Sequence, residues 1–306
     1  KENNATKLSM IKKPDIVCIG SVLWDIIGRS TAKMNLAADR PGKIIRIPGG
    51  VALNLAMSLQ KNGFNSLILS VIGRDHEGDQ LIEQLKLRRI ITDYIYRTTN
   101  FPTDSYMAIE GSNGLVGAIA DTQTLEKCEE NILSPLKNGT LADVKNPWPG
   151  LIALDGNLTE TLLEQINTNP LFKNADVRIA PASPGKALRL RTCLNGNVGT
   201  VYVNLEEANL ILNQNHKTSK LAAQALTNIG VRRAVVTDGE QPVTVSEKNN
   251  LISLTPPIVK VTRVTGAGDV FMASHIQAEM VGQKNETAIR SALNQTAKYI
   301  STSEIL

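Results

Sequence analysis

The sequence predicts an α/β fold: a doubly wound, mostly parallel sheet with helices on both faces and a small antiparallel β-lid. Short apolar strands alternate with helical segments along most of the 306 residues, and glycines end several of these strands. One further stretch carries strands with no helices between them. In folds of this class ligands bind beyond the carboxyl ends of the strands, so we expect the functional residues there.

The first predicted strand covers residues 15–20 (DIVCIG), a buried apolar run that ends in glycine. A helix is predicted over residues 51–62, because its apolar residues recur at helical spacing and Gly63 ends the pattern. The next strand and helix are predicted over residues 66–73 and 76–89. Later strands, with helices between most of them, are predicted at residues 151–157, 176–183, 199–205 and 232–239.

Two stretches interrupt this alternation and predict the lid. Residues 43–48 form a short strand-like segment, and residues 93–121 contain two or three strand-like segments. Within the second stretch Tyr106 and Ala108 alternate with Met107 and Ile109, which is typical of a sheet with one face in water. We expect lid segments at about 28–48 and 93–121, inserted into one domain over residues 15–306 that follows a loose leader, residues 1–14.

The composition excludes several classes of protein. Hydrophobic residues make up 42% and charged residues 20%, which is ordinary globular usage. The formal net charge is only +4 and aromatic residues make up 4%, so we expect no nucleic-acid partner. No apolar run approaches the ~20 residues of a membrane-spanning helix. The three cysteines are widely spaced, which predicts a reducing, cytoplasmic location, and the three scattered histidines predict no zinc site.

The most informative segment is VTRVTGAGDVFMA, residues 261–273. Gly266 and Gly268 at a strand-to-helix turn allow close backbone approach, and the free N–H groups of the helix start favour an anion. If that anion is a phosphoryl group in transfer, Asp269 can take a proton from the attacking hydroxyl. Alternatively, Asp269 only caps the helix and the glycines only pack. A dinucleotide site is disfavoured because Phe271 replaces the third glycine of GxGxxG, and no Walker A motif occurs.

A second segment, PGGVALNLA at residues 48–56, places Gly49 and Gly50 before a helix whose first turn contains Asn54. A glycine pair lets a ligand contact the backbone, and an Asn side chain can both donate to and accept from neighbouring hydroxyls. Asp25 follows the first strand, where its carboxylate could accept hydrogen bonds from two ligand hydroxyls. An ordinary turn and a solvated Asp25 remain the alternative interpretations.

Together these segments resemble the PfkB, or ribokinase-like, family of carbohydrate and nucleoside kinases over nearly the whole chain. The segments that carry the resemblance are GGVALNLA at 49–56, IGRD at 72–75 with Gly78, NLEE at 204–207, TDG at 237–239 and GAGD at 266–269. The resemblance implies that ATP, with Mg²⁺, phosphorylates a hydroxymethyl group on an α/β domain closed by a small β-lid.

The resemblance also implies a role for individual residues. It makes Asp269 the catalytic base and assigns the anion hole to Gly266, Ala267 and Gly268, with the backbone N–H groups of Ala267, Gly268 and Asp269 as donors. The implied substrate-binding residues are Asp25, Gly49, Gly50, Asn54, Ser105, Ile119 and Lys186. The implied nucleotide-binding residues are Thr237, Gly239 and Asn294, and Mg²⁺ would be held through water by Asn204 and Glu207. Lys186 could instead be an ordinary helix-surface lysine.

Three residues depart from the family pattern. Arg263 stands where many members have an Asp that helps to hold a monovalent cation, so we expect no potassium activation, or an Arg263 that replaces the charge of the ion. Pro242 replaces a common glycine, and Ser274 replaces a Gly or Ala at the end of the last motif. None of the three is the base itself.

Shorter segments resemble one subfamily, the pseudouridine kinases. These segments are residues 102–108 and 117–121 of the lid, the strand end at 155–158 and residues 181–186, although Ala180 replaces an Asp of that group. The resemblance implies phosphorylation of the 5′-hydroxyl of pseudouridine. A ribokinase- or adenosine-kinase-like enzyme and a non-catalytic ligand-binding relative remain the alternatives. The apolar lid strands further predict a homodimer joined through the lids.

Overall fold

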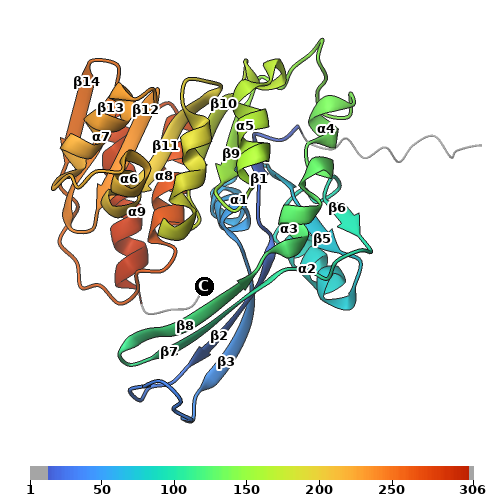
Figure 1. Ribbon diagram of the computed structural model, residues 1–306, viewed down its shortest axis with the longest axis vertical. Coiled ribbons are helices and arrows are strands. Elements are labelled where there is room, and N and C mark those ends of the chain that lie inside the picture. Colours follow the sequence, from blue (N-terminus) through green and yellow to red (C-terminus); the bar gives the residue numbers. More distant parts are fainter. Residues whose placement is uncertain (1–12, 303–306) are drawn as a thin grey trace, which may run out of the picture.

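An eight-stranded sheet runs through the centre of the molecule in the computed structural model, which describes residues 13–302 (Figure 1). Its strands lie in the order β14 (Asn250–Leu254), β13 (Gln241–Glu247), β12 (Arg233–Asp238), β11 (Val198–Asn204), β10 (Asp176–Ala180), β9 (Leu151–Asp155), β1 (Ile16–Ile19) and β4 (Ser66–Leu69). All neighbouring strands from β12 to β4 are parallel. The pairings of β12 with β13 and of β13 with β14 are antiparallel. The predicted mostly parallel sheet is confirmed. The predicted leader, residues 1–14, lies almost entirely outside the described residues.

Helices cover both faces of this sheet because strand side chains alternate between two apolar cores. In β1, Val17 and Ile19 belong to one core, and Ile16 and Cys18 belong to the other. The first core includes residues of α3 (Gln123–Lys127), α4 (Ser134–Lys137), α5 (Glu160–Thr168), α6 (Leu205–Leu212), α7 (Ser219–Asn228) and the 3₁₀ segments η2 (Pro170–Phe172) and η3 (Pro184–Cys193); η1 (Glu129–Asn131) joins α3 to α4. The second includes residues of α1 (Val51–Lys61), α2 (His76–Leu87), α8 (Ala267–Met280) and α9 (Asn285–Ser301).

The lid is a four-stranded sheet that projects from the carboxyl ends of the central strands (Figure 1). Its order is β3 (Lys43–Gly49), β2 (Leu23–Arg29), β7 (Ser105–Gly111) and β8 (Gly114–Asp121). The two outer pairings are antiparallel, and β2 pairs with β7 in parallel. The lid therefore begins at Leu23, earlier than predicted.

Residues 93–98 do not belong to the lid, contrary to the prediction. Within them, β6 (Tyr96–Thr98) pairs in parallel with β5 (Val71–Gly73) in a separate two-stranded sheet. The helix α2 lies between these two strands in the chain, so β5, α2 and β6 form a crossover unit. Such a unit returns the chain beside its first strand, which keeps β6 in the body of the molecule.

The strand register gives the lid two different faces. Residues opposite one another in paired strands share a face, so Asp25 lies with Tyr106, and Ile27 with Ala108; we call this the inner face. The outer face carries apolar side chains that are 45–78% exposed: Met107, Ile109, Ile119 and Ile44. The predicted alternation along β7 is confirmed, because Met107 is 48% exposed and Ala108 only 3%.

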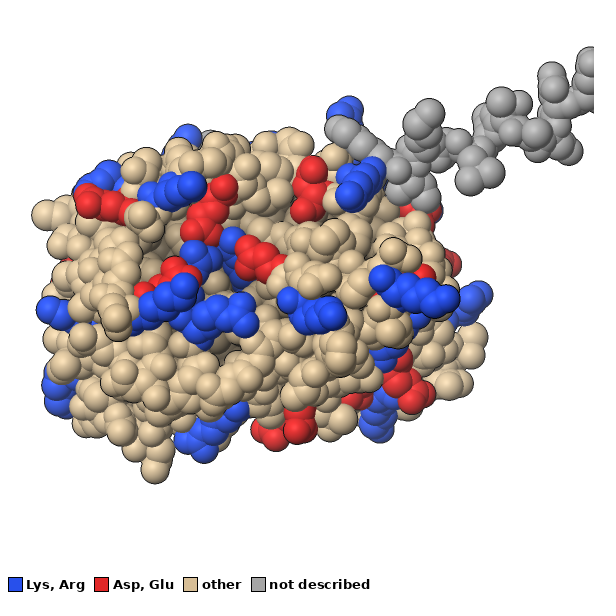
Figure 2. Space-filling model, turned by 90° about the horizontal axis from the view of Figure 1, so that it is seen from above, with Lys and Arg blue, Asp and Glu red and all other residues tan. Residues whose placement is uncertain are grey.

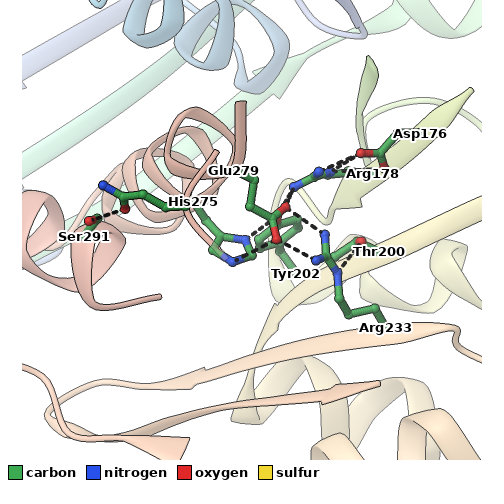
Figure 3. Close-up of polar contacts among 9 residues, drawn as sticks. Asp176, Arg178, Thr200, Tyr202, Arg233, His275, Glu279 and Ser291 are labelled. Carbon is green, nitrogen blue, oxygen red and sulfur yellow. Dashed lines mark hydrogen bonds and ion pairs between the residues drawn. The ribbon is translucent and has the colours of Figure 1, made fainter. Parts of the chain in front are cut away.

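A buried network of charges fixes the far end of α8 to the sheet (Figure 3). Both oxygens of Glu279 accept hydrogen bonds from the guanidinium of Arg233, at 2.7 and 3.1 Å, and Arg178 donates to the same carboxylate. Burial alone would raise the pKa of Glu279, but these two guanidinium groups lower it to about 2. Because α8 also carries Asp269 in its first turn, the network fixes the helix that presents this residue.

The cysteines, the helices and one charged face of the molecule complete the description of the fold. Cys18, Cys128 and Cys193 are free and buried. None of the helices between residues 13 and 302 is long and apolar enough to cross a membrane. On the end of the molecule seen in Figure 2, basic and acidic side chains lie side by side, so this end presents no extended surface of one sign.

Candidate active site

The carboxylate of Asp155, at the end of β9, connects three segments at the carboxyl edge of the sheet. It accepts hydrogen bonds from the Ser21 N–H (2.7 Å) and hydroxyl (2.6 Å), from the Ala52 N–H (3.1 Å) and from the Asn157 N–H (2.6 Å). A Cβ at Gly20 would lie 2.5 Å from this carboxylate. Asp155 is a site residue beyond those predicted, and the sequence signal for it is its position at the end of a buried strand.

The glycine pair before α1 is required by close packing. Gly50 has a φ of 101°, and a Cβ there would lie 2.4 Å from the Ser21 carbonyl oxygen. A Cβ at Gly49 would lie 2.0 Å from a carboxylate oxygen of Asp25. The pair therefore lets Asp25 of the lid lie directly against the start of α1.

Asp269 and Asn54, which are 215 residues apart in sequence, form a hydrogen bond. The Asn54 side-chain amide donates to Asp269 Oδ2 at 3.0 Å. Burial raises the pKa of Asp269 to about 7; the Asn54 bond opposes the rise, and the negative charges of Asp155, Asp25 and Glu207 add to it. A carboxylate with a pKa near neutrality is suited to general base catalysis.

The turn before α8 leaves two backbone donors free. Gly266 has a φ of 82° and ends the preceding loop. The N–H of Ala267, one of the predicted anion-hole donors, instead donates to the Val264 carbonyl at 3.1 Å. Within the described chain, the N–H groups of Gly268 and Asp269 have no backbone acceptor. The anion hole therefore has two free N–H donors, those of Gly268 and Asp269, and not the three that were predicted.

Not all of the predicted substrate-binding residues come together. Asp25 lies on the inner face of the lid, and burial raises its pKa to about 6. Ser105 pairs with Trp24, and Ile119 pairs with Met107, so both lie on the outer face. The structure therefore corrects the expectation that the side chains of Ser105 and Ile119 share a site with Asp25.

Lys186 belongs to this edge of the sheet and is not a surface lysine. It is half-buried at the start of η3, and its ammonium group donates to Asn157 Oδ1 at 2.5 Å. Asn157 in turn donates to the Ser21 hydroxyl at 3.0 Å. Burial and the neighbouring Arg189 charge lower the pKa of Lys186, and Asp155 acts against them. Lys186 is thus connected to the segments that meet at Asp155.

Asn204 and Glu207 form a capping box at the start of α6, in which each side chain accepts from the backbone N–H of the other. Burial raises the pKa of Glu207 to about 7. Within residues 13–302, no group of three or more His, Cys, Asp or Glu side chains is arranged to hold a metal ion. An Asn and a Glu oxygen still suit Mg²⁺, which commonly keeps several waters and takes few protein ligands.

The predicted nucleotide-binding residues lie on two elements: Thr237 and Gly239 at the end of β12, and Asn294 on α9. Thr237 is half-buried near the end of β12, and Gly239 has a φ of 56° in the tight turn to β13. A Cβ at Gly239 would meet nothing within 4 Å. Asn294 is an exposed residue of α9. These positions border open space, where a ligand could contact the backbone of the turn.

Two residues of the C-terminal helix α9, Tyr299 and Ile300, hold the loop before α8. Neither was among the predicted site residues. The Arg263 guanidinium lies 3.8 Å from the centroid of the Tyr299 ring and donates to the Tyr299 carbonyl at 2.9 Å. The N–H of Thr262 donates to the Ile300 carbonyl at 2.8 Å. No local sequence pattern links these residues, because the contacts join segments more than 30 residues apart.

The chain is similar to known proteins in sequence and in fold. The model of the pfkB family carbohydrate kinase matches residues 13–303. The chain is 29% identical to the pseudouridine kinase of Escherichia coli K12, over 95% of this chain and 92% of that protein. Among solved structures, a carbohydrate kinase from Agrobacterium tumefaciens has a TM-score of 0.76 and 24% identity, over 95% of this chain and 92% of that one. Arabidopsis thaliana ribokinase complexed with ribose and ATP has a TM-score of 0.75 and 18% identity, over 96% and 94%.

Proposed function

Because the chain belongs to the PfkB family of carbohydrate kinases, we propose that it transfers the γ-phosphoryl group of ATP to the 5′-hydroxyl of pseudouridine. The product would be pseudouridine 5′-phosphate. The observation that carries the phosphoryl-transfer part is Asp269, held by Asn54 beside the free N–H groups of the α8 start. The choice of pseudouridine is supported by the 29% identity to the E. coli enzyme and by the lid segments that resemble that subfamily.

The free, buried cysteines support a reducing, cytoplasmic location.

In this mechanism Asp269 accepts the proton of the acceptor hydroxyl as its oxygen attacks the γ-phosphorus. The new O–P bond forms as the bond from the γ-phosphorus to the bridging oxygen breaks, and ADP leaves. Asn54 holds one carboxylate oxygen of Asp269 at 3.0 Å, which directs the other oxygen for proton transfer. The N–H groups of Gly268 and Asp269 stabilise negative charge on the transferring group.

The remaining residues bind the two substrates. Asp25, on the inner face of the lid, would accept hydrogen bonds from ribose hydroxyls next to Gly49 and Gly50. Lys186 would contact the acceptor from the opposite wall. Thr237, Gly239 and Asn294 would bind the nucleotide. Mg²⁺, when held through water by Asn204 and Glu207, supplies positive charge to the phosphates.

The test of this proposal is a panel of acceptors assayed under one condition. Pseudouridine differs from uridine by an extra ring N–H, and an enzyme that prefers it needs an acceptor for that group. The lid backbone at 105–107 could supply it, whereas Asp121, the other candidate, pairs with Ser105 and therefore lies on the outer face. A buried acceptor left unpaired costs ~1–3 kcal/mol, so kcat/KM for pseudouridine should exceed that for uridine by roughly ten- to a hundred-fold. Adenosine, cytidine and ribose complete the panel.

Each outcome of the panel has a distinct meaning. A tenfold better substrate other than pseudouridine would reject the pseudouridine assignment and leave the kinase assignment standing, with ribose favouring a ribokinase-like enzyme. If no compound is phosphorylated but one binds tightly, the chain is a non-catalytic ligand-binding relative.

We also propose that Arg263 replaces the charge of a monovalent cation. Its guanidinium already donates to the Tyr299 carbonyl, which leaves this oxygen less available to an ion. Turnover should therefore change by less than about twofold between potassium, sodium and choline chloride at equal ionic strength. A potassium-specific rise in kcat well above this would show that the loop still binds the ion.

The outer face of the lid is the surface through which we expect the chain to form a homodimer. Four apolar side chains on it are 45–78% exposed, and such a surface on a sheet favours association. Light scattering at micromolar concentration should give a dimer mass, and Met107→Glu with Ile109→Glu should give a monomer. Val281→Glu, 61% exposed between α8 and α9, is the control. A monomeric wild-type mass contradicts the dimer, and a dimer that survives both charges excludes this face.

A further inference from the structure

The three carbonyl groups of the turn before α8 are each engaged by a different donor. The Val264 carbonyl accepts from the Ala267 N–H at 3.1 Å, and the Gly266 carbonyl accepts from the Val270 N–H at 3.0 Å. The Thr265 carbonyl, between them, accepts from the Tyr299 hydroxyl at 3.0 Å. Tyr299 lies in the last turn of α9, so its hydroxyl comes from a different helix.

In a regular α-helix the Thr265 carbonyl would have another partner. The N–H of residue i donates to the carbonyl of residue i−4, so the regular donor for Thr265 is the N–H of Asp269. That N–H is one of the two that have no backbone acceptor in the described chain. Gly266, the N-cap of α8, has a φ of 82°, so the helix starts after it and the N–H of Asp269 stays free. The Thr265 carbonyl is held instead by the Tyr299 hydroxyl of α9.

The Tyr299 side chain is well fixed for this role. The Arg263 guanidinium lies 3.8 Å from the centroid of the Tyr299 ring, and it also donates a hydrogen bond to the Tyr299 carbonyl at 2.9 Å. A Cβ at Gly266 would lie 2.7 Å from the Tyr299 hydroxyl, so this contact also requires glycine at that position. Burial raises the pKa of Tyr299, and the phenol therefore keeps its proton as a donor at neutral pH.

We propose that Tyr299 is a positioning residue for phosphoryl transfer, because its hydroxyl holds the Thr265 carbonyl and so fixes the turn that presents the free N–H groups of Gly268 and Asp269. The catalytic half of this inference rests on the proposed kinase activity. Its structural half, the attachment of the turn to α9 by one hydrogen bond, concerns this chain alone. Tyr299 contacts neither substrate directly in this scheme and acts through the backbone of the turn.

The test is Tyr299→Phe, which keeps the ring under Arg263 and removes only the hydroxyl. With the acceptor that the panel identifies, kcat should fall about tenfold while the KM values for ATP and acceptor change less than about twofold, because the donor acts in the transition state. The control is Tyr96→Phe in β6, which lies in a different sheet from the site.

A second measurement does not depend on turnover. In Tyr299→Phe the turn loses its hydrogen bond to α9, so amide hydrogen exchange at Ala267 and Val270, whose N–H groups donate to carbonyls of the turn, should become faster than in the wild type when followed by NMR. Unchanged exchange at both amides would overturn the structural half. Faster exchange with an unchanged kcat would overturn the catalytic role. If the wild type phosphorylates no acceptor, the proposed function and the catalytic half fail together, and the exchange result alone decides the structural half.

Discussion

Asp269→Asn should lower kcat by about 10²-fold or more, while the fold and ATP binding are retained. The replaced oxygen is the proton acceptor for the attacking hydroxyl, and an amide cannot take that proton. The introduced amide keeps an oxygen of the same shape, to which Asn54 can still donate. The loss should therefore come from chemistry and not from a displaced α8. Steady-state kinetics with the best acceptor of the panel measure kcat, and calorimetry measures ATP binding.

The matched control for this variant is Glu286→Gln. Glu286 is the acidic residue in the first turn of the neighbouring helix α9, where it is 61% exposed and pairs with Arg290. Its replacement removes a carboxylate from the first turn of a helix without touching the site, so kcat should stay within about twofold. If Asp269→Asn retains more than about a third of wild-type turnover, Asp269 is not the base.

Catalysis should depend steeply on pH just below neutrality. Burial raises the pKa of Asp269 from 3.8 to about 7, so the carboxyl is protonated below that pH and cannot accept a second proton. We expect kcat/KM to fall by roughly fifty-fold between pH 7 and pH 5, to approach a tenfold fall per pH unit below about pH 6, and to level off above about pH 8. Asp25, with a pKa of about 6, should steepen the fall at the acid end.

The variant Asp269→Asn provides the internal comparison for this profile. Its residual kcat/KM should lose the transition near pH 7 and keep only the one near pH 6 that belongs to Asp25. A wild-type transition near pH 4, the ordinary range of an exposed Asp, would contradict a buried base. A transition near pH 7 that persists in the variant would assign it to another group, of which Glu207 is the first to test.

Much of the order of strands and helices was predictable because it depends on local patterns, but residues 66–73, predicted as one strand, form β4 and β5 in two different sheets. Apolar runs gave β1, β9, β10, β11 and β12, and helical spacing with Gly63 gave α1 within one residue of its observed end. The strand β2 was not predicted. Its sequence, LWDIIGR, mixes apolar and polar residues without the strict alternation that indicates a strand. The prediction that residues 93–98 belong to the lid was wrong because strand propensity is a local property that does not name the partner strand. The pairing of β6 with β5 depends on how distant segments pack.

The candidate site divides in the same way. The sequence alone determined that Asp269 follows a glycine turn at a helix start and that Gly49 and Gly50 precede another helix, since these motifs are continuous in the chain. Only the tertiary structure decided which lid face each side chain occupies, because a strand's two faces look alike until the register of its neighbours is fixed.

Tertiary structure also decided the contacts that make these motifs a site. Asn54 meets Asp269 across 215 residues, Ser21 meets Asp155 across 134, and the Tyr299 hydroxyl meets the Thr265 carbonyl across 34. Each of these hydrogen bonds joins polar groups from different elements, so it exists only once the helices have packed on the sheet. The sequence thus determined the fold class and the residue types at the strand ends, whereas packing of distant segments determined which polar groups face one another.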